Sequence, residues 1–324
     1  MNVLVTGGAG FIGSYLCRAL HDLGHSVRVA DCAKRNGGLL TFDYRNLNIL
    51  EKQGLKEAMR GVELVIHLAA KHKYFGVSEK EFFTVNEIGT RNILEVMSEA
   101  DIRKIIFFST VAVYGETNGP TDENKEPKPN TPYGLSKLAA ENWVKKWALE
   151  GMDRSAIILR PTVIFGPKNK GNIYRLIRQI YHRIYIPIGK GNNIKSIAYI
   201  ENVVKATIFL LNLEMEGIHI FNYSDEPHME YREIVDIIYS GLTRKPPAYC
   251  LPVSPILRVA NLLDWIISKA GIRFSLGTTI LKMNKPTFYK SDKIRKFGFS
   301  PVCSSKEGLE KMVKWFIENK KQES

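Results

Sequence analysis

The chain has 324 residues, of which 44% are hydrophobic and 24% charged, which is typical of a globular protein with a substantial core and argues against a disordered chain. No uncharged run reaches the roughly 18 residues that a membrane-spanning helix needs. The net charge of +13 comes mostly from residues after 160, and such an excess attracts a polyanion, a membrane surface or a small anionic substrate.

The chain begins with a strand, a glycine turn and a helix. Residues 2–6 are predicted as a short apolar strand, and a helix with Leu16, Cys17 and Leu20 on one face follows the turn. Between them, the pattern Gly-x-x-Gly-x-x-Gly allows a tight turn and a close approach of the backbone to a pyrophosphate, which the free N–H groups at a helix N-terminus bind. We therefore expect the pyrophosphate of a dinucleotide to contact Gly7, Gly10, Phe11, Ile12 and Gly13.

The second strand ends in an acidic residue. Residues 25–30 form an apolar run that leads to Asp31. A carboxylate at this position accepts hydrogen bonds from both ribose hydroxyls and repels a 2′-phosphate, so it favours NAD over NADP. A third strand, predicted at residues 39–42, is expected to end at Asp43, which could reach the adenine edge.

Strand and helix go on alternating through the first half of the chain. Strands are predicted at 62–67, 104–108 and 155–160, and a helix at 82–97. This alternation predicts an α/β fold with a doubly wound parallel sheet (a Rossmann fold), in which ligands bind at the carboxyl ends of the strands. His67, at one such end, is predicted to be a satisfied core histidine. The small residues after it would let the backbone approach a cofactor, so we expect contacts from Leu68, Ala69 and Ala70.

A Tyr-x-x-x-Lys pattern opens the helix that follows Thr131. Pro132 suits the first helical turn, and residues four apart on a helix share one face, so Tyr133 and Lys137 are expected to lie together. A phenol titrates near pH 10, so a tyrosine base near neutrality needs its pKa lowered by roughly 3 units, or about 4 kcal/mol of phenolate stabilisation. A fixed ammonium one turn away supplies part of this stabilisation, and an oxidised nicotinamide would add more.

Beyond residue 165 the alternation loosens. Strands are predicted at 197–200 and 217–222, and helices at 172–184, 201–212, 229–241, 255–269 and 305–319. We expect an NAD-binding Rossmann domain over residues 1–165, to which 195–225 returns. The remaining residues, 166–324, are expected to form a smaller, mainly helical substrate-binding region.

The sequence predicts no stable membrane insertion. The most apolar stretch, Val253 to Ser268, is interrupted by Arg258 and Asp264 and is therefore predicted as an amphipathic helix. The N-terminus leads directly into a strand, so we expect no signal peptide. The four cysteines have neither a disulfide-framework nor a metal-ligand spacing, so we expect reduced thiols, no metal and a cytoplasmic protein.

Taken together, these motifs resemble the extended short-chain dehydrogenase/reductase family, and specifically its NAD-dependent nucleotide-sugar epimerase/dehydratase branch. The resemblance extends over nearly the whole chain and includes Thr6 to Gly13, His67 to Ala70, Ser109 to Gly115, Tyr133 to Lys137, Leu159 to Pro161 and Ala198 to Ile200. It implies that NAD is the cofactor and that Asn86 and Pro161 also contact it. It further implies that Thr110 hydrogen-bonds the reacting sugar oxygen and that Tyr133 is the general base. Lys137 would hold the nicotinamide ribose and lower the pKa of the tyrosine.

Two departures from the family pattern narrow the substrate. Dehydratases of this branch carry an acidic pair directly after the catalytic threonine, but this chain has Val111 and Ala112 there, so 4,6-dehydration is not expected. Galactose-type epimerases usually have Asn where this chain has Val163, and Arg where it has Lys195, whose ammonium lacks the bidentate fork. For a nucleotide-diphosphate sugar we expect contacts from Thr110, Lys195 and Asn172, with Arg175 and Arg178 as alternative donors to the diphosphate.

The resemblance predicts an NAD-dependent nucleotide-sugar 4-epimerase that works through a transient 4-keto intermediate, in carbohydrate metabolism such as polysaccharide biosynthesis. A nucleotide-4-keto-sugar reductase or dehydrogenase needs the same three residues and stays open as an alternative. A non-catalytic NAD-binding regulatory protein is a more remote one. No nucleic-acid-binding motif is visible, so we expect no nucleic-acid partner. Family members usually dimerise through the tyrosine helix, and the stripe with Trp143 and Trp147 permits a homodimer, with burial inside the monomer as the alternative.

Overall fold

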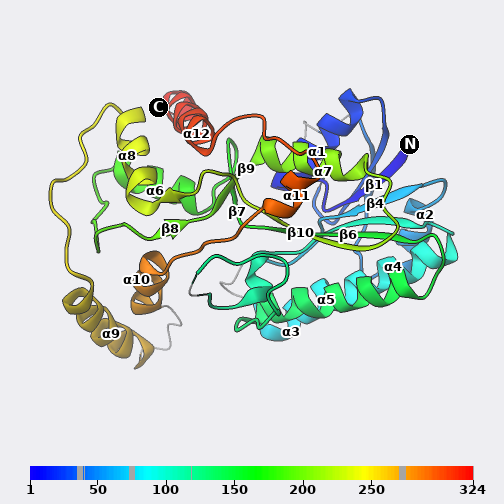
Figure 1. The fold of residues 1–324 in the computed structure, drawn as a ribbon, viewed down its shortest axis with the longest axis horizontal. Coiled ribbons are helices and arrows are strands. Elements are labelled where there is room, and N and C mark those ends of the chain that lie inside the picture. Colours follow the sequence, from blue (N-terminus) through cyan, green and yellow to red (C-terminus); the bar gives the residue numbers. More distant parts are fainter. Residues whose placement is uncertain (35–38, 40, 73–76, 118, 270–274, 324) are drawn as a thin grey trace.

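Seven parallel strands form the main sheet of this computed structural model, which describes residues 1–324 except 35–38, 40, 73–76, 118, 270–274 and 324. The strand order is β10-β6-β5-β4-β1-β2-β3 (Figure 1). The strands are β1 (Asn2–Thr6), β2 (Ser26–Asp31), β3 (Asp43–Asn46), β4 (Leu64–His67), β5 (Lys104–Phe108), β6 (Ser155–Pro161) and β10 (Gly217–Tyr223). The predicted doubly wound α/β sheet is therefore confirmed.

Helices cover both faces of this sheet. The helices α1 (Phe11–Asp22) and α7 (Ile200–Leu211) pack together on one face. The other face carries α2 (Lys52–Ala58), α4 (Gly89–Glu99) and α5 (Pro132–Leu149). Successive side chains of a strand point to opposite faces of the sheet. Val3 and Val5 therefore pack in the core on the side of α1 and α7, and Leu4 packs in the core on the side of α2, α4 and α5. Burial on both faces explains why the central strands are continuous apolar runs.

The helix predicted at 82–97 is divided into three parts. It begins as α3 (Glu79–Phe83), continues as a π-helical turn over Thr84–Ile88, and becomes α4. Ser78 caps α3 in a capping box with Glu81, which the apolar pattern alone does not reveal. A π-helical turn inside a helix is often found at a functional site.

The third strand lies later in the sequence than predicted. Leu39, Thr41 and Phe42 are outside any strand, and β3 begins at Asp43. Leu39 and Phe42 are nevertheless buried in the core that contains α1. β3 is an edge strand with the polar sequence Asp-Tyr-Arg-Asn, so its position cannot be found from hydrophobicity.

The sheet reverses its direction of growth at β1. From β1 the chain adds β2 and β3 on one side, and then β4, β5 and β6 on the other. In such a sheet a ligand crevice forms between the loops that leave the two strands at the switch point. Gly7, directly after β1, has φ +71°, and a Cβ on it would lie 2.6 Å from the backbone N of Ala69 after β4. The two loops are therefore in contact, and only glycine fits at this position.

The C-terminal half adds a second, smaller region beside the sheet. Figure 1 shows α6, α8, α9 and α10 gathered at the end of the molecule away from β1 and β2. The strand β10 pairs with β6 and α7 packs against α1, so both elements lie in the Rossmann part. The further elements are β7 (Val163–Phe165), α6 (Asn172–Tyr181), β8 (Ile194–Lys195), β9 (Ile197–Tyr199), β11 (Met229–Glu230), α8 (Tyr231–Gly241), α9 (Val253–Lys269), α10 (Leu276–Asn284), α11 (Asp292–Lys296) and α12 (Ser305–Glu323).

Candidate functional site

A cavity of about 960 Å³ lies at the carboxyl ends of the central strands. Its wall comes from the loops after β1, β2, β3, β4, β5 and β6, from Val85, from the first two turns of α5, and from residues 169, 196, 287 and 289. Most of the predicted site residues line it: Gly7, Gly10, Phe11, Ile12, Gly13, Asp31, Leu68, Ala69, Ala70, Thr110, Tyr133, Lys137 and Pro161.

The cofactor end of the cavity is formed by the glycine turn. Gly10 caps α1 without a side chain, and the first hydrogen bond of the helix runs from the backbone N of Ser14 to the carbonyl of Gly10 at 3.0 Å. The N–H groups that precede Ser14 therefore lie before the helical ladder and can bind an anion. A Cβ on Gly13 would lie 2.5 Å from the carbonyl O of Gly7, which keeps the turn tight.

Asp31 holds the second wall of the cofactor end. Its carboxylate accepts hydrogen bonds from the backbone N of Ala9 at 3.0 Å and of Ala33 at 2.9 Å. These bonds fix the glycine turn against the end of β2 and leave the carboxylate at the cavity wall. A glycine cradle, free helix N–H groups and a carboxylate at the end of the second strand together fit a dinucleotide.

The hydroxyl groups of Thr110 and Tyr133 are placed by two helix starts. Thr110 follows β5, and its Oγ1 accepts a hydrogen bond from the backbone N of Ala112 at 3.1 Å. Thr131 caps α5 in the same manner, with Pro132 in the first turn, as predicted. The ring of Tyr133 lies beside that of Phe82.

Lys137 is almost completely buried, one turn after Tyr133. Its Nζ lies 4.0 Å from the centre of the Phe107 ring, and it lines the cavity. Burial removes water from the ammonium and lowers the pKa of Lys137 to about 7, although the charge of Glu141 partly opposes this shift. A lysine in this state exchanges its proton near neutral pH.

A buried polar network connects α5, the helix of Lys137, to the sheet. Glu141 accepts hydrogen bonds from Ser109 Oγ at 2.5 Å and from Arg160 Nε at 2.8 Å. Arg160 also donates to the hydroxyl of Tyr114, which donates in turn to Asn222 Oδ1, both at 2.8 Å. Burial raises the pKa of Tyr114 to about 12. The network joins the residue before Thr110 to α5, β6 and β10, so it fixes the end of β5 relative to the helix of Tyr133 and Lys137.

His67 is held by hydrogen bonds on both ring nitrogens. Thr90 Oγ1 donates to a backbone carbonyl, so it must accept from His67 Nε2, at 2.9 Å. His67 Nδ1 therefore accepts from Thr6 Oγ1, at 2.7 Å. Burial, together with the charge of Lys137, lowers the pKa of His67 well below its usual value. The prediction of a satisfied core histidine is confirmed.

Two residues predicted to bind the cofactor lie outside the cavity wall. Asn86 is buried, and its amide donates to Ser136 Oγ at 2.9 Å and to the carbonyl of Lys71 at 3.0 Å, so it ties the loop after β4 to α5. Asp43 starts β3 at the amino end, away from the crevice, and pairs with Arg28 and Arg45. The expectation that a strand ends at Asp43 is wrong because β3 begins there, and the contact of Asp43 with the adenine stays a prediction.

Two residues predicted to bind the substrate also lie outside the wall. Asn172 is exposed at the start of α6, and the side chain that lines the cavity there is that of Asn169. Lys195 Nζ donates to the carbonyls of Lys282 at 2.9 Å and Lys285 at 2.6 Å. The ammonium of Lys195 therefore caps the C-terminus of α10, and the part of both residues in substrate binding stays a prediction.

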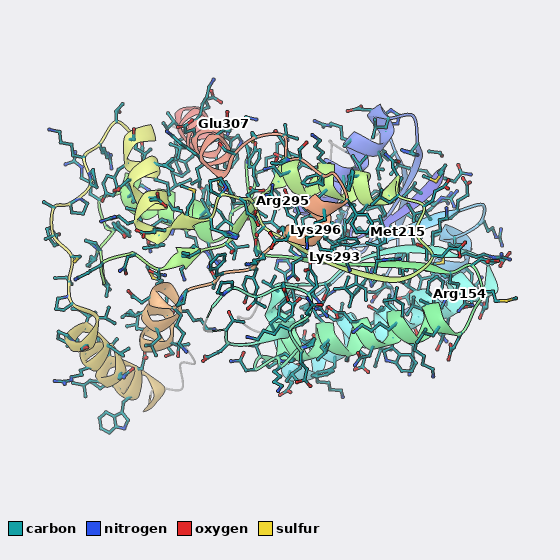
Figure 2. All side chains as sticks on the ribbon, in the orientation of Figure 1. Arg154, Met215, Lys293, Arg295, Lys296 and Glu307 are labelled. Carbon is teal, nitrogen blue, oxygen red and sulfur yellow. The ribbon has the colours of Figure 1, made fainter. Side chains whose placement is uncertain are left out.

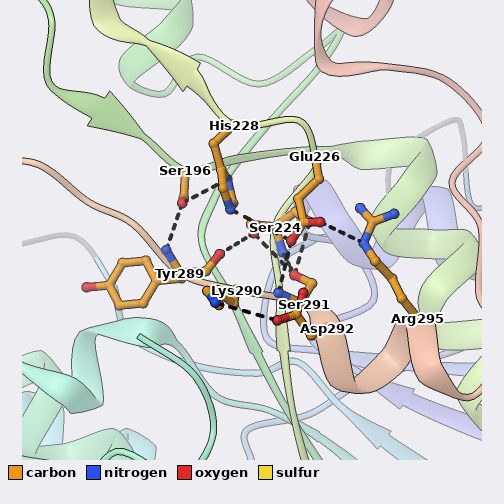
Figure 3. Close-up of polar contacts among 9 residues, drawn as sticks. All are labelled: Ser196, Ser224, Glu226, His228, Tyr289, Lys290, Ser291, Asp292 and Arg295. Atoms are coloured by element: carbon orange, nitrogen blue, oxygen red, sulfur yellow. Dashed lines mark hydrogen bonds and ion pairs between the residues drawn. The ribbon is translucent and has the colours of Figure 1, made fainter. Parts of the chain in front are cut away.

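The substrate end of the cavity is closed by the segment after α10. Ser196 Oγ accepts from the backbone N of Tyr289 at 2.9 Å, and Ser224 Oγ donates to the carbonyl of Tyr289 at 2.6 Å (Figure 3). Glu226 pairs with Arg295 at 3.1 Å and accepts from the backbone N of Ser291. Figure 3 shows these contacts on both sides of the segment, so its place in the cavity wall is fixed.

The charges around the cavity restrict its chemistry. Among the described residues that line it, Asp31 is the only acidic one, and Lys71 and Lys137 are the lysines. Val111 and Ala112 occupy the wall directly after Thr110, where a dehydratase would need acids. Sequence reasoning missed Glu141, whose position one turn after Lys137 was the available signal, and it missed Ser196 and Tyr289, which carry no motif.

Comparison with known proteins places this geometry in a family. The model of the NAD dependent epimerase/dehydratase family matches residues 3–223. The chain is 31% identical, over 99% of its length and 97% of the other protein, to the N-acetyl-alpha-D-glucosaminyl-diphospho-ditrans,octacis-undecaprenol 4-epimerase of Escherichia coli O157:H7.

Two solved structures share the fold. The UDP-glucuronic acid 4-epimerase of Bacillus cereus, in complex with NAD, has a TM-score of 0.79 at 23% identity and covers 98% of this chain and 99% of that chain. The UDP-glucose 4-epimerase of Thermus thermophilus, also with NAD, has a TM-score of 0.77 at 23% identity, with coverages of 98% and 99%. The chain is thus, as its motifs predict, an enzyme of the NAD dependent epimerase/dehydratase family with NAD as its cofactor.

Proposed function

We propose that this enzyme is a 4-epimerase of a sugar that is linked to its carrier through a diphosphate, and that it works through a transient 4-keto sugar. The observation that carries the proposal is the convergence of Thr110, Tyr133 and Lys137 with the glycine turn on one cavity whose wall has no acid after Thr110. The relative from E. coli, which matches almost over its whole length, is itself a 4-epimerase.

The proposed roles follow from the positions of the side chains. Tyr133 takes the proton of the sugar 4-hydroxyl and later returns it, and Thr110 donates a hydrogen bond to the same oxygen. The Lys137 ammonium favours the phenolate because an opposite charge nearby lowers the pKa of a phenol. Glu141 and Arg160 hold the lysine helix and the end of β5 in register during both steps.

When bound, NAD would supply the chemistry of reversible hydride transfer with the sugar carbon. The chain would hold the pyrophosphate with the N–H groups around Gly10 and Gly13, and the adenosine ribose with Asp31. Because Asp31 is anchored by two backbone N–H groups, its negative charge is fixed at the cavity wall, and it would repel the 2′-phosphate of NADP.

The proposed substrate carries its sugar on a nucleoside diphosphate or on a polyprenyl diphosphate. Both carriers present the same diphosphate to the enzyme, and the E. coli relative acts on the polyprenyl form. Asn169 and Ser196 line the substrate end of the cavity and are proposed to contact this part of the substrate. Lys195 would contribute only if it left the carbonyl groups of α10.

The quaternary state is part of the same proposal. Trp147 is buried and donates to Ser98 Oγ at 3.0 Å, so the tryptophan stripe is largely used inside the monomer. Ile88, in the π-helical turn before α4, and Leu135, on the tyrosine helix, expose apolar side chains, which supports a homodimer through this face. The molar mass measured by light scattering tests this state.

The first experiment identifies the nucleotide bound to the purified protein and then follows UDP-, GDP- and dTDP-sugars and a polyprenyl-diphosphate sugar in detergent. Retained NAD and redox-neutral interconversion of one sugar with its 4-epimer are the expected results. Stoichiometric consumption of added NADH would favour the 4-keto-sugar reductase instead. Absence of any turnover with NAD bound would contradict both.

A further inference from the structure

The helix α9 exposes the apolar side of its amphipathic pattern. Val259, Leu262, Leu263 and Ile266 follow the spacing i, i+3, i+4 and i+7, and are 56%, 58%, 42% and 51% exposed. Trp265, beside this stripe, is 57% exposed. Large apolar side chains in such a contiguous row are unusual on a water-facing helix and indicate an interaction surface.

The opposite side of α9 is the one that faces the protein. Ala260 is buried against the rest of the molecule. The carboxylate of Asp264 accepts hydrogen bonds from the backbone N of Leu276 at 2.7 Å and of Gly277 at 2.9 Å, and from Ser275 Oγ at 2.8 Å. Asp264 thus caps α10 and orients α9 so that its apolar row points away from the molecule. Figure 2 shows side chains of this helix projecting outward at the edge of the structure.

The chain beside α9 carries further exposed apolar residues. Ile184, Ile186 and Tyr249 are 64%, 54% and 64% exposed. They belong to two segments that are paired by the bridge between Ile188 and Leu251, directly before α9. An aromatic and aliphatic surface made of several segments is typical of proteins that lie at a lipid–water interface.

Two stretches of this half of the chain are rich in positive charge, although α8, at the same end of the molecule, carries Glu233 and Asp236. Residues 166–200 contain no acidic residue and seven basic ones: Lys168, Lys170, Arg175, Arg178, Arg183, Lys190 and Lys195. Residues 240–291 contain one acidic residue, Asp264, whose carboxylate is already used by α10. Arg258 on α9 and Lys282 on α10 are exposed. Such a surface complements the negative potential of a bilayer that contains anionic phospholipids.

The apolar row is mechanically connected to the substrate end of the cavity. α9 packs on α10, and the C-terminus of α10 is held by Lys195. The segment that follows α10 brings Thr287 and Tyr289 into the cavity wall, where the contacts of Figure 3 fix it. The cofactor end of the cavity belongs to the opposite, Rossmann side of the molecule.

We propose that α9 is a docking helix that lies on the surface of an anionic phospholipid bilayer, so that the enzyme takes its sugar from a membrane-anchored polyprenyl diphosphate. The apolar row enters the interface, and Arg258 on α9 and Lys282 on the adjacent α10 contact the phospholipid headgroups. No helix among the described residues is long and apolar enough to cross a bilayer, so the association is peripheral. The choice of carrier rests on the proposed 4-epimerase function, whereas the docking itself does not.

Sedimentation of the full-length protein with vesicles tests the docking directly. Vesicles of phosphatidylcholine mixed with phosphatidylglycerol should retain the wild type, and vesicles of phosphatidylcholine alone should retain much less. The Leu262→Asp/Ile266→Asp variant should bind the anionic vesicles at least about tenfold more weakly because two apolar contacts become charged. Equal binding of the variant and the wild type, or equal binding to both vesicle types, would overturn the proposal.

A matched control uses the other end of the molecule. Leu149, the last residue of α5, and Met152, in the loop before β6, are 78% and 90% exposed. They lie in the chain just before Arg154, which Figure 2 places far from α9. Leu149→Asp/Met152→Asp should leave vesicle binding unchanged. If instead the α9 variant changed the molar mass of the protein while the wild type ignored the vesicles, the surface would be an interface between two copies, which contradicts the proposal.

Activity separates this inference from the proposed function. The ratio of turnover on a polyprenyl-diphosphate sugar in vesicles to turnover in detergent should fall at least about tenfold in the α9 variant and stay constant in the control. Turnover in detergent without any vesicle binding would contradict the docking alone. Vesicle binding without turnover of any sugar would contradict the proposed function alone.

Discussion

The helices α1 and α9 place their apolar side chains in opposite ways. Leu16 and Leu20 of α1 are completely buried against the sheet, and the polar side of the helix faces water. On α9, Leu262 and Ile266 face outward while Asp264 faces the protein. Both helices are amphipathic in sequence, so the pattern alone does not tell which side packs inward. The side of an amphipathic helix that is free for a partner can therefore be told only once its polar contacts are known.

The largest expected effect concerns the catalytic group of the Rossmann half. Tyr133→Phe should lower turnover by about 10³-fold or more, because general acid–base catalysis typically contributes 10²–10⁴. Bound NAD and the melting temperature should stay unchanged. Tyr174→Phe, which alters a packed tyrosine between α6 and α12, serves as the control and should keep its activity. Normal turnover in Tyr133→Phe would show that Tyr133 is not the general base.

The buried network should make Glu141 far more important for stability than any acid on the surface. Glu141→Gln leaves Arg160 as a buried charge with a weaker partner, so the free energy of unfolding should fall by about 3–5 kcal/mol. Glu150→Gln, on the same helix, removes only an exposed ion pair with Lys146 and should change it by less than about 1 kcal/mol. Urea denaturation measures both, and similar losses would contradict the role given to the network.

The buried ammonium of Lys137 is expected to lower the free energy of unfolding near neutral pH. Its pKa falls from 10.5 to about 7 on folding, so the unfolded state binds more protons between these values and stability should rise with pH through this window. Lys137→Met should abolish turnover, stabilise the fold near pH 7 by about a few kcal/mol, and remove this rise. Melting temperatures from pH 7 to 10 measure it. A less stable variant would show that the buried ammonium is well compensated.

The contact between the two loops at the switch point can be measured with two glycines. Gly7→Ala and Gly24→Ala both place alanine at positive φ, which costs about 1–2 kcal/mol. Only at Gly7 does the added Cβ also meet the backbone of Ala69, since the space around Gly24 is open. Gly7→Ala should therefore lower the free energy of unfolding by about 1–3 kcal/mol more than Gly24→Ala does. Gly7→Ala should also lose bound NAD. Equal effects would mean that the loops are free to separate.

The smallest expected effect tests directly whether the apolar side of α9 is exposed while that of α1 is buried. Leu262→Ser on α9 should change the free energy of unfolding in water by less than about 0.5 kcal/mol, because the side chain is already exposed. Leu16→Ala on α1 should cost about 2–5 kcal/mol. A large loss in Leu262→Ser would show that the apolar row is covered within the protein in solution.

The sequence was most informative where backbone geometry restricts the residue type. The glycine turn, the helix start at Pro132, and the strand ends at Asp31 and Thr110 all lie where they were predicted. These features are local, since each depends on residues within one or two turns. The fold class followed from the apolar strands that are buried on both faces of the sheet.

The remaining features depend on partners that are distant in the sequence. Lys195 was expected at the diphosphate, but the carbonyl groups that bind its ammonium come from the end of α10. The side chains of the edge strand β3 are mostly exposed to water, so the strand carries no apolar run. The partner of Glu141, Arg160, is on the next strand along the chain, β6. Such choices are made by tertiary packing and leave no local signal.

The hydrogen bond from Tyr114 to Asn222 has a consequence for synthesis on the ribosome. Asn222 belongs to β10, which is translated long after the glycine turn, the tyrosine helix and the strand of Arg160. A nascent chain that ends before β10 would hold Thr110, Tyr133 and Lys137, the residues proposed to be catalytic, yet one edge of β6 would be unpaired and the Tyr114 hydroxyl would lack its acceptor. The strand β10, which is the last strand of the sheet to be synthesised, thus completes the polar network of Tyr114, Arg160 and Glu141. Chains stalled before residue 217 should therefore be cut by protease within the tyrosine helix, whereas chains that include β10 should resist.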